Sequence, residues 1–177
     1  MRRKRINRIS LVALCLVFFG VAGWLWLGNS TSSYTSPDGT YSLKYPKTWE
    51  PYATGGVVAF YDKQSPNAYR ENVTIVMSKM APGWREDFES TLEKGLSAIG
   101  RNYKMLGTKQ VTLGGREVTE FTYALSLEGQ SLLNEVYIFE MGNGLAAVMT
   151  CSALRDNTAA IEKDFKTIYT SFKINSK

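Results

Sequence analysis

Residues 104–127 read KMLGTKQVTLGGREVTEFTYALSL, and this stretch determines the class of fold. In its second half, every second residue from Thr119 to Leu127 is threonine, aromatic or leucine, which is the pattern of a strand with one buried face. Gly114-Gly115 separates the two halves, and a glycine pair between two strand patterns predicts a two-residue hairpin turn. Strands joined by so short a turn must pair antiparallel.

This antiparallel pattern continues toward the C-terminus. Glu128-Gly129 is a second turn signal, and Gly142-Asn143-Gly144 is a third, each followed by an apolar run. The sequence therefore predicts a meander of four strands. Its strands are Lys104–Leu113, Arg116–Leu127, Leu132–Met141 and Leu145–Cys151.

Two amphipathic helix patterns flank the meander, over Glu86–Ile99 and Asn157–Phe172. In each, apolar residues recur at spacings of three or four, which places them on one helix face. Three further strand patterns precede the first helix. One-faced helices and a one-faced sheet bury their apolar surfaces against each other, so we expect an α+β fold with an antiparallel sheet sandwiched by helices. The three early strands are Tyr41–Tyr45, Val57–Tyr61 and Val73–Lys79.

The N-terminus has the pattern of a membrane anchor. Residues 1–8 (MRRKRINR) are strongly basic, and residues 9–27 carry no charge. A helix of that length spans about 28 Å, close to the hydrocarbon thickness of a bilayer. Because basic flanks remain cytoplasmic, we expect residues 1–8 in the cytoplasm, residues 9–27 as a signal anchor and residues 35–177 as an extracytoplasmic domain after a linker at 28–34. Trp24 and Trp26 would then lie at the outer membrane interface.

A cleaved signal peptide is the alternative for this segment. Gly20-Val21-Ala22 and Val21-Ala22-Gly23 could each serve as a cleavage site, and the domain would then be secreted. The apolar run continues past both, through Trp26 and Leu27, which favours the uncleaved anchor and a single-pass location in the cell membrane.

The basic net charge comes from the anchor. Five of the 21 Lys and Arg residues lie within residues 1–8, which leaves 16 against 16 Asp and Glu residues for the rest of the chain. A neutral outer domain gives no support for nucleic-acid binding. Cys15 lies in the anchor, so Cys151 has no partner for a disulfide within the outer domain.

The order of elements, with particular residues, resembles the family of PsbP, the extrinsic photosystem II protein, and its DcrB-like bacterial relatives. The matching motifs begin with Tyr41–Trp49 (YSLKYPKTW), an aromatic strand followed by Pro-x-x-Trp, and with Glu71–Ile75 (ENVTI). Leu113–Val118 (LGGREV) and the closing Ile168–Phe172 (IYTSF) complete them. Together they cover the outer domain from about Tyr34 to Ile174.

This resemblance implies a sheet with helices on both faces. It also implies a non-enzymatic function, namely binding to, assembling or stabilising a membrane protein complex. The chain departs from the plant photosystem subunit by its own predicted membrane segment and by the absence of histidine. A histidine-based metal site described for such proteins therefore does not carry over, and we expect no metal or other cofactor.

The motifs of common enzyme classes are missing as well. Without histidine, the Ser-His-Asp and Cys-His arrangements cannot form. A carboxylate pair could still carry out glycoside chemistry, and Glu120, Glu135 and Glu140 are the strand residues available for it. Each of the three alternates with apolar neighbours, which favours a solvated sheet face or edge instead.

Two loops contain residues suited to binding a protein. Tyr69 and Arg70 lie in a long polar loop, and Trp84 and Arg85 lie just before the first helix. Exposed aromatic and arginine side chains are favoured interface anchors. For Trp84 the alternative is a hydrophobic staple onto Phe88.

The sequence therefore favours a membrane-anchored binding module that associates with a membrane or envelope protein complex and catalyses no reaction. The alternative function is a carrier of a small apolar ligand or lipid. Its pocket would lie between a helix and the strand that bears Phe121 and Tyr123.

Overall fold

A computed structural model describes residues 30–66, 68–99 and 101–175. By internal contacts the chain divides into two compact units, Met1–Thr31 and Ser32–Lys177. The expected anchor at residues 9–27, with Trp24 and Trp26, lies outside the described residues. Within the described ranges, no helix has both the length and the apolar character needed to cross a membrane.

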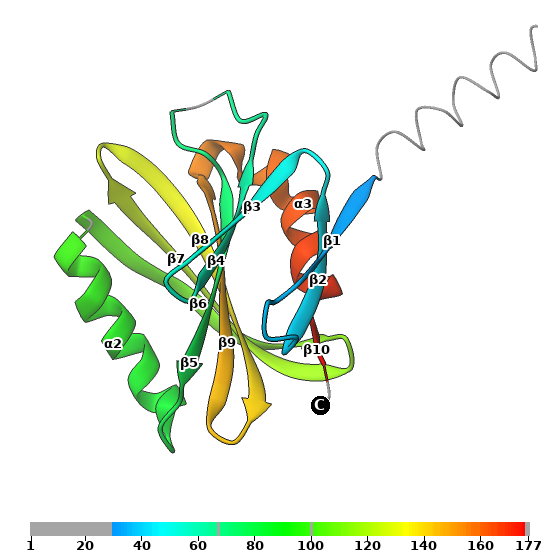
Figure 1. The fold of residues 1–177 in the computed structure, drawn as a ribbon. Helices are drawn as coiled ribbons and strands as arrows, with labels where there is room; N and C mark the ends of the chain where they lie inside the picture. The colour runs from blue at the N-terminus through cyan, green and yellow to red at the C-terminus, as the bar shows by residue number, and fades with distance from the viewer. Residues whose placement is uncertain (1–29, 67, 100, 176–177) are drawn as a thin grey trace, which may run out of the picture. The chain divides into compact units, whose positions relative to one another are not determined.

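The second unit is built on a seven-stranded sheet in which every pair of neighbours is antiparallel (Figure 1). The strand order is β3-β4-β5-β9-β8-β7-β6, so β9 is central and β3 and β6 are the edges. The predicted meander is confirmed. The strands are β3 (Trp49–Thr54), β4 (Val57–Asp62), β5 (Asn72–Lys79), β6 (Arg101–Leu113), β7 (Arg116–Leu127), β8 (Gln130–Gly142) and β9 (Leu145–Leu154).

A second, three-stranded sheet has the order β1-β2-β10. Its strand β1 (Thr31–Thr35) occupies most of the segment that we expected to be a polar linker. The other two strands are β2 (Tyr41–Pro46) and the short β10 (Lys173–Ile174), which pair antiparallel and bring the two ends of the domain together.

Two helices lie on opposite faces of the large sheet, as predicted (Figure 1). Helix α2 (Trp84–Ile99) packs on one face, and α3 (Thr158–Ser171), preceded by the short helix η1 (Arg155–Asn157), packs on the other. We refer to these faces as the α2 side and the α3 side.

Because strand residues alternate, each central strand contributes to both core layers. In β8, Val136 and Ile138 belong to the α2-side core, whereas Tyr137 and Phe139 belong to the α3-side core. The α3-side core also contains residues of β2, so the small sheet and α3 together cover that side. All four of these β8 side chains are at most 3% exposed, so both faces of this part of the strand are apolar and buried.

Trp49, which ends the Pro-x-x-Trp motif, is a buried core residue. It is the first residue of the edge strand β3 and is 2% exposed. Its ring packs edge-on against Phe165, with ring centroids 5.9 Å apart, and its indole nitrogen donates to Asp164 Oδ2 at 3.0 Å. The edge strand β3 is therefore tied to α3 through this side chain.

Candidate functional site

The α2 side of the sheet is incompletely covered. Helix α2 contacts β6 and packs on the cluster formed by β7 and β8, while β3, β4 and β5 lie at the other end of the sheet. Strand register places Tyr52, Tyr61, Val57 and Val76 on the α2 side of those three strands. Tyr52 is 59% exposed and Val76 is 39% exposed. We call these four residues the open surface.

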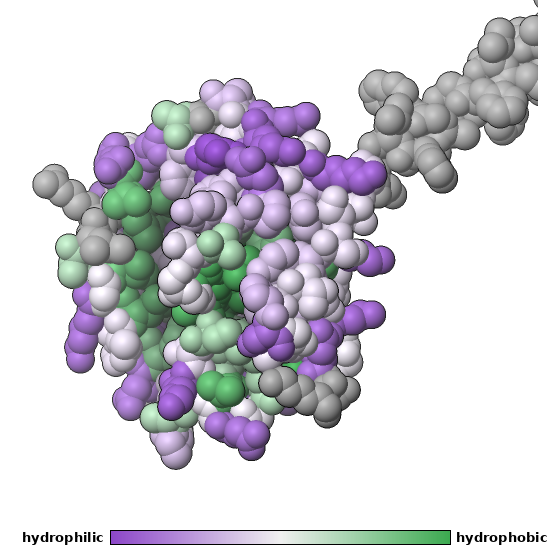
Figure 2. All heavy atoms as spheres, viewed as in Figure 1, coloured by the Kyte–Doolittle hydropathy of each residue, from purple (hydrophilic) through white to green (hydrophobic). Residues whose placement is uncertain are grey.

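A valley lined by hydrophobic residues lies between α2 and the central strands (Figure 2). The apolar stripe of α2, formed by Phe88, Leu92 and Leu96, is only half-buried against the sheet. The equivalent residues of α3, Ile161, Phe165 and Ile168, are fully buried. The apolar stripe of α2 is thus more accessible than that of α3.

Trp84 and Arg85 begin α2 and lie at one end of this valley. The Trp84 ring meets Phe88 edge-on at 5.7 Å between centroids, which is the contact expected for a hydrophobic staple. Trp84 nevertheless remains half-exposed. The Arg85 guanidinium lies 5.4 Å from the Trp84 ring centroid and binds Glu140 Oε1 at 2.7 Å.

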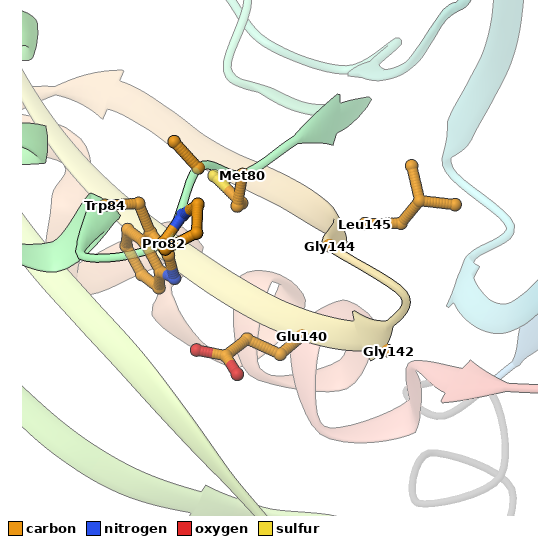
Figure 3. Close-up of a pocket in the computed structure, with 8 residues that line it drawn as sticks. Met80, Pro82, Trp84, Glu140, Gly142, Gly144 and Leu145 are labelled. Atoms are coloured by element: carbon orange, nitrogen blue, oxygen red, sulfur yellow. The ribbon is translucent and has the colours of Figure 1, made fainter.

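A cavity of about 330 Å³ adjoins Trp84 (Figure 3). The loop before α2 forms one wall and the β8–β9 turn forms the other. Trp84 and Pro82 lie together on one wall and the Glu140 carboxylate faces them from β8. The lining residues are Met80, Ala81, Pro82, Trp84, Glu140, Gly142, Gly144 and Leu145.

Tyr69 and Arg70 lie at the opposite end of β5. Tyr69 is not a free loop residue, because it packs on the α2-side core and its hydroxyl forms a hydrogen bond with Ser152 Oγ. Arg70 is exposed, and its guanidinium lies 5.4 Å from the Tyr61 ring centroid and binds Glu50 Oε1 at 2.9 Å. Arg70 therefore borders the open surface, whereas Tyr69 packs on the α2-side core.

The four predicted residues belong to the same side of the sheet but form two separate groups. One group precedes β5 and the other follows it, and eight strand residues span roughly 24 Å. Both arginines show the same arrangement, an aromatic ring on one side and a glutamate as partner. The sequence did not indicate either glutamate as a partner, because Glu50 and Glu140 are remote from the arginines along the chain.

The strand glutamates do not form one site. Glu120 and Glu135 lie on the α3 side with Val118 and Tyr137, whereas Glu140 lies on the α2 side.

Our expectation that all three glutamates are solvated is wrong for Glu120, which is 6% exposed and binds Lys109 Nζ at 2.9 Å. It is also wrong for Glu135, which is half-buried and accepts a hydrogen bond from the Tyr137 hydroxyl at 2.9 Å. Burial raises the pKa of Glu135, and the charge of Glu120 adds to this effect.

Phe121 and Tyr123, expected to line a ligand pocket, are 2% and 5% exposed. Phe121 packs against Phe88 at 4.7 Å between ring centroids, and Tyr123 packs against Tyr103 at 5.7 Å. Side chains from α2 and β6 thus occupy the space next to them. Across the parts of the chain that the structure describes, no group of three or more His, Cys, Asp or Glu residues could hold a metal ion.

Sequence reasoning missed two features of this side. Tyr52 belongs to β3, which we did not predict, so its position on a strand face was not visible. The amide nitrogen of Asn134 and the hydroxyl of Tyr103 are buried and have no hydrogen-bond partner among the described residues. A polar residue at the centre of the apolar β8 pattern was the available signal for Asn134.

Comparison with known proteins identifies the family profile that the chain matches and solved structures with the same fold. The PsbP family profile matches residues 29–174. The solution structure of cyanobacterial PsbP (CyanoP) from Synechocystis sp. PCC 6803 is 18% identical with a TM-score of 0.59, covering 82% of this chain and 93% of that one. LpqN of Mycobacterium tuberculosis, described as involved in cell envelope biogenesis, is 13% identical with a TM-score of 0.57, covering 83% and 91%.

A protein of unknown function from Pseudomonas aeruginosa, PA94, described as a putative regulator, has the same fold. It is 13% identical with a TM-score of 0.53, and the alignment covers 84% of this chain and all of that one. No curated protein sequence matches the chain. At these identities the solved structures establish the fold alone.

Proposed function

The chain belongs to the PsbP family, and on that premise we propose that it is a membrane-anchored, non-catalytic binding module for a membrane or envelope protein complex. Residues 9–27 would hold it in the bilayer with the domain outside the cytoplasm, as the charge pattern of the N-terminus favours. The α2 side of the domain would bind the partner.

The open surface is the observation that supports this proposal most directly. Tyr52 and Val76 expose apolar area on a sheet face whose other half is covered by α2. Soluble domains rarely leave such area unused, and aromatic residues and arginine dominate the binding energy of interfaces. Tyr52, Tyr61 and Arg70 are residues of this kind, and they are adjacent across β3, β4 and the start of β5.

The relatives support the same class of function. LpqN is described as involved in cell envelope biogenesis, and CyanoP is a PsbP protein of a cyanobacterium. The description of LpqN fits the kind of envelope-associated protein proposed here. For the present chain, the relatives support the class of partner, and they do not identify the partner itself.

The test is capture of the partner by the full-length protein. We would crosslink it in its own membranes, purify it in mild detergent and quantify the proteins recovered. Replacing both Tyr52→Ala and Val76→Thr should reduce recovery of a stoichiometric partner at least tenfold, because both changes remove apolar contact area. Leu106→Thr is the matched control, since Leu106 is 45% exposed but lies on the edge strand β6.

Equal recovery with the double variant and the control would show that the open surface does not bind the partner. Recovery of the wild-type protein alone, with no associated protein, would contradict the proposed function as a whole. Thermal unfolding of each variant shows whether its fold is intact.

A second candidate function is carriage of an apolar ligand or lipid. It is favoured by the half-buried stripe of α2 together with the unpaired Asn134 amide and Tyr103 hydroxyl beneath it. A chain-like ligand inserted between α2 and the sheet would bury its tail against Phe88 and Leu92. It could also accept a hydrogen bond from Asn134, since an unpaired buried donor is costly.

Native mass spectrometry of the full-length protein from its own membranes tests the carrier function. A bound lipid should be retained by the wild-type protein and lost from Asn134→Leu, which removes the donor at similar volume. Lipid retained equally by both proteins would argue against the Asn134 site, and a protein free of small ligands would argue against the carrier.

A further inference from the structure

Arg85 shows what the cavity beside Trp84 can bind. Its guanidinium is held between the Trp84 ring, 5.4 Å from the centroid, and Glu140 Oε1, 2.7 Å away. An aromatic face and a carboxylate are the two groups that bind a cationic side chain best in combination. The chain therefore already carries a cation in the position that a ligand's cation would take.

This internal contact is easily exchanged. The Arg85 and Glu140 side chains are 56% and 50% exposed, and exposed ion pairs contribute little to stability because water screens them and long side chains lose entropy. Arg85 is attached to the first turn of α2, and its release costs no core packing. A competing cation that is better buried would displace it.

The neighbouring cavity provides that burial. Its walls are mostly apolar, with Met80 and Pro82 from the loop before α2 and Leu145 from the start of β9. Arginine and lysine bury their methylene stems along such surfaces while the charged end stays near water. At about 330 Å³ the cavity can hold one long side chain but not an element of secondary structure.

The surrounding charge also favours a cation. The N-terminal end of a helix by itself repels positive charge. Glu140 is the charged residue among those that line the cavity, and its carboxylate faces the cavity from β8. The charge in the cavity wall is therefore negative.

We propose that the cavity lined by Trp84 and Glu140 receives an arginine side chain of the partner protein, which takes the place of Arg85. Arginine is favoured over lysine because its planar guanidinium stacks on an aromatic ring and pairs with a carboxylate at the same time. The inference rests on the proposed binding function for the source of the arginine. The cavity itself can be tested without that partner.

The probe is N-acetyl-L-arginine amide, and its neutral analogue N-acetyl-L-citrulline amide is the control. Binding to the full-length protein in detergent is followed through the indole N–H resonance of Trp84, assigned with Trp84→Phe. The arginine probe should shift this resonance, and the citrulline probe should not. Arg85→Met should tighten binding at least threefold by removing the competitor.

Glu140→Gln should weaken the arginine probe about tenfold. Glu117→Gln is the matched control, because Glu117 is an exposed carboxylate on β7 outside the cavity lining. Equal shifts from both probes, or an affinity unchanged by both Arg85→Met and Glu140→Gln, would overturn the proposal.

The two proposals fail separately. If the probe does not bind but the crosslinked partner is recovered, the arginine site is wrong and the binding function stands. If the probe binds as expected but no partner is recovered, the cavity is confirmed as an arginine site and the proposed function is contradicted.

Discussion

Glu135 is a carboxylate at which folding opposes ionisation. Burial raises its pKa above the usual value of 4.5, and the nearby Glu120 charge raises it further, while the Tyr137 hydroxyl partly offsets both. A raised pKa means that the stability contributed by Glu135 is complete below pH 4.5 and is lost as pH rises through the folded-state pKa.

Glu135→Gln should therefore gain stability relative to the wild type as pH rises above 4.5, and the difference should level off once Glu135 is ionised in the folded protein. The glutamine side chain can still accept the hydrogen bond from Tyr137. Urea unfolding of both proteins between pH 4 and pH 8 measures this difference. A difference that did not change with pH would show that Glu135 ionises as it does in the unfolded chain.

The pKa shift of Asp38 has the opposite sign to that of Glu135. Hydrogen bonds from Ser36 and from the Thr40 amide and hydroxyl lower its pKa to about 2, from a usual value of 3.8. The Thr40 nitrogen lies 3.1 Å and its hydroxyl 2.8 Å from Asp38 Oδ1, which closes the turn into β2.

The stability contributed by Asp38 is thus present above pH 3.8 and is lost as pH falls through about 2. Asp38→Asn keeps an oxygen acceptor for the turn and removes the charge, so acid unfolding of this variant should depend less steeply on pH between 4 and 2. Circular dichroism during acid titration tests this, and identical titration curves for the two proteins would contradict it.

The two helices differ in how much they stabilise the fold. Ile168 of α3 is 0% exposed in the α3-side core, whereas Leu92 of α2 is half-buried. Ile168→Ala should cost about 2–5 kcal/mol through lost burial and the cavity it leaves. Leu92→Ala should cost about 1 kcal/mol, since only part of its side chain leaves water on folding. Equal losses in urea unfolding would show that α2 packs as tightly as α3.

The elements that sequence reasoning found are those with strong periodicity. The α3 stripe and the strands joined by glycine turns were predictable because period and turn chemistry agreed. Strand β3 (WEPYAT) was missed because Pro51 and the polar residues around it give no alternation, and its edge position tolerates that proline. Strand β1 was missed because TSSYT reads as a polar linker, and it forms only by adding to β2.

At the level of the whole domain, the candidate site could be predicted only in part. The sequence indicated Trp84 and Arg85, but the cavity beside them needs Glu140, which is 55 residues away from Arg85. The same limit applies to Tyr69, whose hydroxyl meets Ser152 across 83 residues and holds the loop onto the core. Such contacts depend on strand order, and local patterns leave that order undetermined.

Cys151 provides a probe for the stability of the whole domain. It lies on the central strand β9 and is 0% exposed. Burial raises the pKa of its thiol well above the usual value, and Glu135 and Glu120 contribute to the same direction. Because only the thiolate reacts, modification requires an opening that exposes this strand. An opening of the central strand has a free energy close to that of global unfolding.

In a Cys15→Ser background, the Cys151 thiol should react with a disulfide reagent at least a thousandfold more slowly in the folded protein than in urea, given a stability of about 5 kcal/mol or more. Ser131→Cys combined with Cys151→Ala is the matched control, because Ser131 is exposed on the neighbouring strand β8. The control thiol should react at nearly the same rate with or without urea. Fast labelling of Cys151 in the folded protein would mean that the sheet opens at β9 without global unfolding.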